Sequence, residues 1–303
     1  MALSAGHSPE ALVRPGNRLP PLRCRRFCLD VTARTQIMGV LNVTPDSFSD
    51  GGLYLDPGRA VAYAQEMVAA GADLIDVGGE STRPGAEPVS AEEELRRILV
   101  PVRRLVETLP VPISVDTYKA DVAAVVLDGG VDLINDMSGL SFDPRMASVV
   151  AEAGAGLVLM HIRGTPRTMQ EDPRYADVVP EVREYLRERI LVAEARGVRP
   201  EAIVVDPGIG FGKRVEHNLD LLNRLPELQS LGKPLLVGPS RKSFIGSVLD
   251  LPLEERLEGT AAAVAIAIWQ GAHIVRVHDV RAMARVARMT DAIRKESKPG
   301  LES

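Results

Sequence analysis

The chain has 303 residues, of which 45% are hydrophobic and 25% charged, with a formal net charge of −5 at pH 7. This is ordinary globular composition, and the acidic balance argues against nucleic acid or an anionic membrane as a partner. No apolar run reaches the ~18 residues that a membrane-spanning helix needs.

The N-terminal stretch carries no targeting pattern. Residues 1–20 lack an apolar core and a cleavage pattern, so we expect residues 1–21 to be a disordered leader ahead of one folded unit over 22–298. Cys24 and Cys28 have no histidine nearby, which makes a poor metal site. Free cysteines in a reducing cytoplasm are the simpler interpretation, and we therefore expect a cytoplasmic protein.

The first structural elements set a pattern that the chain then repeats. Residues 22–35 predict a short hairpin. The apolar run 37–41 predicts a buried strand, which turns polar at Asn42 and breaks into a loop rich in Ser, Asp and Gly. Residues 57–70 then predict a helix, because proline stands near the start and glycine follows the end.

Seven more short apolar segments follow, each separated from the next by a helical pattern. The predicted strands end at about Val77, Asp116, Asp136, His161, Asp206, Gly238 and Asp279, and the predicted helices cover about 91–108, 118–127, 143–153, 180–197, 216–224, 240–249, 254–270 and the stretch up to 295. Strands flanked by helices are parallel and buried on both faces. We therefore predict an α/β fold, a single (β/α)8 TIM barrel with an N-terminal β-hairpin.

Polar residues follow almost every predicted strand, and in a barrel of this kind the carboxyl ends of the strands form the active site. One such residue often only caps a helix or satisfies a loop, but the whole set converging on one mouth indicates a ligand site. The residues are Asn42, Asp76, Asp116, Asn135, His161, Asp206, Ser240–Ser243, Arg276 and His278.

The types of residue suggest what the ligand carries. Asp116, Asn135 and Asp206, with Lys242, would suit a flat heterocycle whose ring N–H and exocyclic amino group donate to one carboxylate. A second group, Arg276, His278 and Asn42, suits an anion and a metal, since an arginine fork binds phosphate and a neutral amide ligates Mg²⁺ together with phosphate oxygens. The stretch 240–243 precedes a helix, whose free N–H groups favour a carboxylate or a phosphate.

The glycine-rich stretch DPGIGFGK, residues 206–213, matches neither nucleotide-binding pattern. Its spacing departs from that of a P-loop, and a lysine occupies the third glycine position of the dinucleotide fingerprint. We expect its glycines to let the backbone pass close to a ligand. Of the histidines, His161 and His273 are interpreted as structural, and His7 and His217 as surface residues.

Seven motifs in this order, NVTPDSFSDGG, DVGGESTRPGA, SVDT, INDMSG, DPGIGFGK, GPSRKSFIG and RVHDV, resemble the dihydropteroate synthase family over about residues 36–290. The resemblance implies a transferase of folate biosynthesis, and a sulfonamide target. It would join 6-hydroxymethyl-7,8-dihydropterin diphosphate to 4-aminobenzoate and release pyrophosphate, with Mg²⁺, through an SN1-like pterin methylene cation. It also implies a homodimer.

The resemblance assigns roles to matched residues. It implies that the pterin is bound by Asp116, Asn135, Met160, Asp206, Phe211 and Lys242. It implies that Asn42, Arg276 and His278 neutralise the diphosphate, with Asn42 as the Mg²⁺ ligand. It implies that 4-aminobenzoate meets Phe48, Asp50, Thr82, Arg83, Pro84, Lys242 and Ser243. The loops at about 43–52 and 79–88 are expected to close and exclude water.

Two alternatives share the barrel. A methyltetrahydrofolate-type methyltransferase would make similar pterin contacts but would handle no diphosphate, so the motifs TPDSFSDGG, STRPG and RVHDV argue against it. A non-catalytic binding or scaffold protein is expected to have lost loop residues, Arg276 or Lys242, and none of these is missing.

Overall fold

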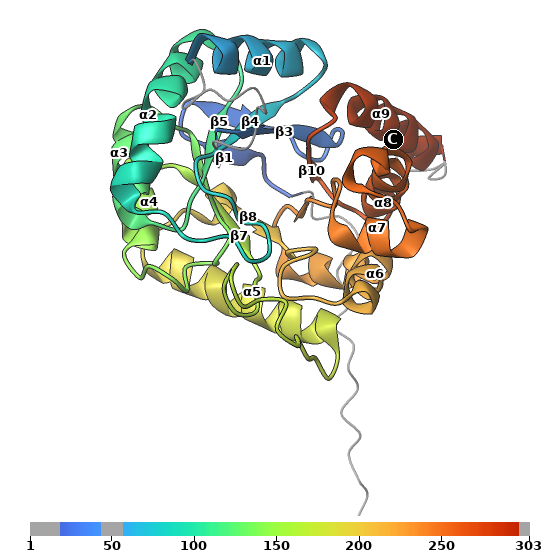
Figure 1. The fold of residues 1–303 in the computed structure, drawn as a ribbon. Coiled ribbons are helices and arrows are strands. Elements are labelled where there is room, and N and C mark those ends of the chain that lie inside the picture. The colour runs from blue at the N-terminus through green and yellow to red at the C-terminus, as the bar shows by residue number, and fades with distance from the viewer. Residues whose placement is uncertain (1–18, 44–56, 297–303) are drawn as a thin grey trace, which may run out of the picture.

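The computed structural model describes residues 19–43 and 57–296, which form one barrel with its helices outside (Figure 1). Most of the expected leader lies outside the described residues. So do Phe48 and Asp50, the two residues expected on the first loop.

Eight parallel strands form the barrel in the order β8-β7-β6-β5-β4-β3-β10-β9. The edge strands meet where Val205 N donates to Pro234 O at 3.0 Å and Val205 bridges Leu235, which brings the sheet close to full closure. The strands are β3 (Gln36–Asn42), β4 (Leu74–Gly78), β5 (Ile113–Asp116), β6 (Leu133–Asp136), β7 (Gly156–Met160), β8 (Ile203–Asp206), β9 (Leu236–Val237) and β10 (Ile274–Val277). The predicted (β/α)8 fold is confirmed.

The helices surround the strands, as Figure 1 shows. They are α1 (Pro57–Ala69), α2 (Ala91–Thr108), α3 (Ala120–Asp128), α4 (Met146–Ala153), α5 (Val178–Ala195), α6 (Val215–Asn223), α7 (Ser243–Leu249), α8 (Leu257–Trp269) and α9 (Val280–Glu296). Short 3₁₀ turns cover Pro200–Ala202, Leu225–Leu231 and Leu253–Glu255. Among the described helices, none is both long and apolar enough to cross a bilayer.

Two helices begin a few residues away from the predicted positions, one because of backbone conformation and one because of a side-chain cap. The segment expected from 240 becomes helical only at Ser243, since Arg241 adopts a left-handed φ of 56° and Lys242 is extended. Helix α5 begins earlier than predicted because the side chain of Asp177 accepts from Val179 N at 3.2 Å. These shifts leave the order of elements as predicted.

The predicted hairpin is present and closes the amino-terminal end of the barrel. Strands β1 (Leu22–Cys24) and β2 (Phe27–Leu29) pair antiparallel. Leu22 and Cys24 are fully buried in a cluster with interior residues of the barrel strands. Both cysteines are free, as expected, with Cys24 buried and Cys28 exposed.

Alternation along each strand separates two environments. Outward side chains such as Ile75 and Val115 pack against the helices in the main core. Inward side chains such as Leu74 and Leu133 fill only the layer of the barrel interior next to the hairpin. Two residues further along the same strands, the interior positions are Asp76 and Asn135. The barrel is thus apolar at one end and polar at the other, and buried polar groups must find partners.

Candidate functional site

Arg276 of β10 joins two carboxylates inside the barrel, one on β4 and one on β5. Its Nε donates to Asp76 Oδ2 at 2.7 Å, and one terminal nitrogen donates to Asp116 Oδ2 at 2.9 Å. The side chain of Asp76 is 0% exposed and that of Asp116 is 12% exposed. Burial raises the pKa of Asp116, and the Arg276 guanidinium opposes that rise. This triad places a cation and two anions inside the barrel mouth.

Asp76 belongs to this triad, although the motif comparison left it without a role. Its Oδ2 also accepts from Asn135 Nδ2 at 3.0 Å. The contact fixes which way the Asn135 amide faces, so Asn135 Oδ1 stays available as an acceptor for a ligand N–H. A sequence signal existed, because Asp76 follows the buried Leu74 by two positions and so faces the interior.

Substituting asparagine for Asp76 is expected to lower stability and activity together. Removing the charge loosens Arg276 and places an amide against the Asn135 N–H. We expect a loss of about 2–4 kcal/mol in the free energy of unfolding, because a buried ion pair is broken. The catalytic efficiency should fall by about tenfold or more, since a donor to the substrate is misplaced. Urea unfolding and steady-state kinetics measure the two effects.

Asp132 provides the matched control. Its side chain is also 0% exposed and binds Arg26 through both oxygens at 2.9 Å, but it lies at the amino-terminal end of the barrel. Asp132→Asn should therefore lower stability and leave the catalytic efficiency of the folded protein unchanged. Equal effects of the two substitutions on activity would contradict the role given to Asp76.

Asp206 and Lys242 place two more ionisable groups of opposite sign in the mouth. Asp206 ends β8, is buried, and its Oδ1 accepts from Gly208 N at 2.7 Å. Lys242 Nζ donates to Ile209 O and lies 4.4 Å from the centre of the Phe211 ring. Burial raises the pKa of Asp206 against the opposing charge of Lys242, and burial lowers the pKa of Lys242 to about 8.

An apolar wall lies beside these charges. Met160 is 5% exposed at the end of β7 and packs in a small cluster with Met137, Ile162 and Met169, which Phe211 borders. Methionine side chains adapt to the face of a flat ring. A carboxylate, a lysine and an apolar wall together suit a flat, polar-edged heterocycle.

His278 lies just beyond β10 as a neutral donor. Ser240 Oγ accepts from His278 N at 3.2 Å and lies 3.0 Å from His278 Nδ1. Since the serine oxygen accepts from the backbone N–H, we assign its hydroxyl as the donor to Nδ1. Nδ1 is then the acceptor, and the ring proton is on Nε2. Burial, and then Arg276, lower the pKa of His278 to about 4. His278 therefore offers an N–H, whereas the sequence-based expectation gave it a share of charge neutralisation.

Asn42 ends β3 at the rim of the mouth, half-buried and paired with Gly78 of β4. Gly78 has no side chain, and a Cβ there would lie 3.5 Å from Asn42 Oδ1. Within residues 19–43 and 57–296, no group of three or more His, Cys, Asp or Glu could hold a metal. One amide oxygen at an uncrowded rim fits Mg²⁺, which keeps several waters and binds substrate phosphates.

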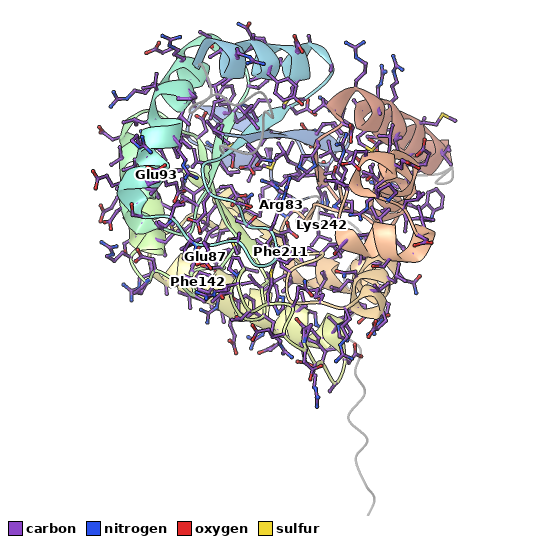
Figure 2. The ribbon with its side chains drawn as sticks, in the orientation of Figure 1. Arg83, Glu87, Glu93, Phe142, Phe211 and Lys242 are labelled. Atoms are coloured by element: carbon purple, nitrogen blue, oxygen red, sulfur yellow. The ribbon has the colours of Figure 1, made fainter. Side chains whose placement is uncertain are left out.

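The loop with Thr82, Arg83 and Pro84 extends across the mouth. Its turn is closed by Ala86 N donating to Arg83 O at 3.0 Å, and Gly85 N donates to Pro166 O at 3.0 Å in the segment after β7. In Figure 1 this teal stretch passes in front of β7 and β8, and Figure 2 places Arg83, Phe211 and Lys242 inside the ring of helices. Ser243, by contrast, is exposed at the start of α7.

The site residues expected from the sequence therefore divide into three groups. Those on the strands and the loops directly after them meet at one mouth. Thr82, Arg83 and Pro84 lie on the loop that crosses it. Phe48 and Asp50 fall outside the described residues.

Comparison with known proteins gives one consistent family. A family profile described as pterin binding enzyme matches residues 38–278. A dihydropteroate synthase of a Synechocystis species is 50% identical over 275 residues, which cover 90% of this chain and 95% of that protein.

Solved structures agree with this family. Yersinia pestis dihydropteroate synthase in a sulfonamide complex has a TM-score of 0.86 and 43% identity, covering 91% of this chain and 99% of that one. The Xanthomonas albilineans enzyme with 4-aminobenzoic acid has a TM-score of 0.85 and 42% identity, covering 92% and 99%. At such identity the likeness extends to sequence as well as fold.

Proposed function

The chain belongs to the dihydropteroate synthase family of pterin-binding enzymes, and we propose that the polar end of its barrel performs that family's reaction through the residues grouped there. The reaction joins dihydropterin diphosphate to 4-aminobenzoate, gives dihydropteroate and pyrophosphate, and belongs to folate biosynthesis. The methyltransferase and scaffold alternatives receive no support from the relatives. One observation carries the proposal: ion pairs occupy the interior positions where apolar filling stops.

The pterin ring would lie between Asp206 and Lys242 on one side and the apolar wall on the other. Asp206 can accept the ring N–H and the exocyclic amino group together, a bidentate pattern like that of a carboxylate with guanidinium. Lys242 would donate to the ring carbonyl, and Asn135 Oδ1 would accept from a ring N–H. Met160 and Phe211 would cover the faces. The diphosphate would then point towards β10.

The diphosphate would be bound at the rim. Arg276 lies between Asp76 and Asp116 and can turn a terminal nitrogen towards phosphate oxygens, while His278 donates through Nε2. Mg²⁺, held by Asn42 and the diphosphate oxygens, would neutralise part of the leaving-group charge. The Asp116 carboxylate would lie on the side where a pterin methylene cation develops, which supports the SN1-like course.

The 4-aminobenzoate site would be built on the loop that crosses the mouth. The Xanthomonas relative was solved with 4-aminobenzoic acid. Here Thr82, Arg83 and Pro84 lie over the mouth, and Lys242 and Ser243 border it at the start of α7. Phe48 and Asp50 would complete the site from the first loop.

The reaction and its metal can be tested together. Purified protein given both substrates and Mg²⁺ should form dihydropteroate and pyrophosphate in equal amounts. EDTA should stop turnover, and added Mg²⁺ should restore it. Product formed at the full rate in excess EDTA would contradict the magnesium proposal, and no product from folded protein would contradict the activity.

Lys242 predicts a basic limit to catalysis. Its pKa is lowered to about 8, so the side chain is charged below that pH and neutral above it. A neutral Lys242 no longer balances the Asp206 carboxylate, so kcat/KM for the pterin diphosphate should fall as pH rises through about 8. This ratio reports the free enzyme. The Lys242→Arg variant should shift the fall to higher pH, and an unchanged profile in that variant would contradict the assignment.

We further propose a cytoplasmic homodimer that pairs through α7, α8 and α9. Ile266 and Trp269 lie one helical turn apart on α8, as do Met289 and Ile293 on α9, and the two helices pack together. Their exposed fractions, 50%, 47%, 63% and 47%, form an apolar face that a second copy would cover. Light scattering should give a dimer, and Trp269→Glu a folded monomer. A monomeric wild type, or fractionation outside the cytoplasm, would contradict these proposals.

A further inference from the structure

The glycine-rich loop after β8 is pressed against the segment that follows β7. Gly208, Gly210 and Gly212 have φ values of +67°, +83° and +63°, which side-chain-bearing residues rarely adopt. A Cβ on Gly208 would clash with the carbonyl oxygen of His161, and one on Gly212 with that of Arg163. The loop therefore has one well-defined path, although the proposed reaction gives its backbone no chemical role.

A buried lysine lies at the centre of this loop. Lys213 is only 3% exposed, and its Nζ donates to Gly208 O and to Phe211 O at 2.9 Å each. It also contacts His161 Nδ1 at 2.9 Å. Nζ also lies 3.4 Å from His161 O, and none of these partners is a carboxylate. Burial lowers the pKa of Lys213 well below its ordinary value, and in either charge state the amino group keeps two N–H donors for the Gly208 and Phe211 carbonyls.

His161 is suited to accept that third hydrogen bond. It is 4% exposed and its ring lies edge-on to Tyr185, with centres 4.9 Å apart. Burial and the neighbouring Lys213 lower its pKa, so the ring is neutral and Nδ1 can accept. The structural interpretation of His161 made from the sequence is consistent with this contact, which adds a partner that local sequence could not identify.

The other side of the same loop contacts Asp206 and Lys242, the two ionisable groups assigned to the pterin site. Gly208 N donates to Asp206 Oδ1 at 2.7 Å. Ile209 O accepts from Lys242, and the Phe211 ring lies under the Lys242 ammonium. Lys213 therefore binds the carbonyls of Gly208 and Phe211, which lie on either side of Ile209 in the chain. The carbonyl of Ile209 is the one that binds Lys242.

We propose that Lys213 is a positioning residue for pterin binding: its buried amino group fixes the loop so that Asp206 and Lys242 face the ring with the correct geometry. The inference rests on the assignment of Asp206 and Lys242 to the pterin. Without the amino group of Lys213, Phe211 O loses its donor, whereas Gly208 O keeps the bond from Phe211 N at 3.0 Å. The peptides around Ile209 would then turn to find new partners, and the Lys242 contact would move with them.

Lys233 distinguishes positioning from simple stabilisation. It is 9% exposed, and its Nζ donates to Glu194 Oε1 and to Pro200 O at 2.8 Å each. It precedes β9, at the end of the barrel opposite the mouth. A purely structural role for Lys213 would make the methionine variants of the two lysines behave alike.

The test measures binding of 6-hydroxymethyl-7,8-dihydropterin, which lacks the diphosphate and cannot react, by titration calorimetry. Lys213→Met should raise its dissociation constant by about tenfold or more. Lys233→Met should lower the melting temperature and leave the dissociation constant unchanged. A folded Lys213→Met protein with wild-type affinity would overturn the proposal.

A second variant serves if Lys213→Met does not fold. His161→Leu removes one acceptor and leaves the lysine in place, so it should weaken pterin binding in the same direction and to a smaller extent. Unchanged affinity in folded His161→Leu would then overturn the proposal. A wild-type protein that fails to bind the pterin, or an Asp206→Asn variant that binds normally, would instead contradict the pterin site itself.

Discussion

Replacing Arg276 with methionine is expected to lower kcat/KM for dihydropterin diphosphate by about 10³-fold or more. Two losses combine in this variant. The diphosphate loses its guanidinium, and removal of one such donor typically lowers kcat by about 10²–10³-fold. Asp76 and Asp116 also lose the cation that offsets their mutual repulsion. Steady-state assays of pyrophosphate release measure the effect.

The same substitution should destabilise the fold. Breaking a buried ion pair by removing one partner costs about 3–5 kcal/mol, because the remaining charges stay buried. Arg276→Lys is the matched variant, since it keeps a charge but cannot contact both carboxylates. It should recover much of the stability and little of the activity. Wild-type pyrophosphate release in Arg276→Met would contradict the diphosphate assignment.

Replacing Asp206 with asparagine should weaken pterin binding by about 10- to 100-fold. The amide has nearly the same shape but offers one acceptor and one donor to a ring edge that presents two donors. A buried donor left unpaired costs about 1–3 kcal/mol, and sites built on hydrogen bonds discriminate strongly for that reason. Calorimetry with the unreactive hydroxymethyl dihydropterin measures the change in affinity.

An exposed carboxylate controls for the charge change. The side chain of Asp121 is 64% exposed and pairs with Arg145 on the surface. Asp121→Asn should bind the pterin as the wild type does, since surface ion pairs contribute little. Equal affinities for the Asp206 and Asp121 variants would remove Asp206 from the pterin site.

The order of elements could be predicted because each strand is a short apolar run and each helix has its own start and stop signals. Both faces of the strands are buried near the hairpin, so continuous apolar runs such as 37–41 were a reliable sign of parallel strands. Helix starts were less predictable. At Arg241 a left-handed residue delays α7, and at Asp177 a side-chain cap brings α5 forward.

The site was predictable as a set of positions and less so as a set of contacts. The polar residues at strand ends indicated the mouth, and the motifs named most of its members. Pairings across the barrel are different, because Asp76 and Arg276 are 200 residues apart in the chain. The neutral state of His278 likewise follows from its burial, its neighbour Arg276 and Ser240, and the role of Lys213 from its partners in space. Local sequence patterns carry none of this information.

A structure of the protein with a dihydropterin whose diphosphate is attached through a methylene group in place of the ester oxygen, so that it cannot leave, tests the central claim most directly. The account predicts the ring between Asp206 and Lys242, with both ring-edge donors on the Asp206 carboxylate. It predicts the phosphate oxygens within hydrogen-bonding distance of Arg276 and of His278 Nε2. A ring bound outside the barrel mouth, or a diphosphate that contacts neither Arg276 nor His278, would contradict it.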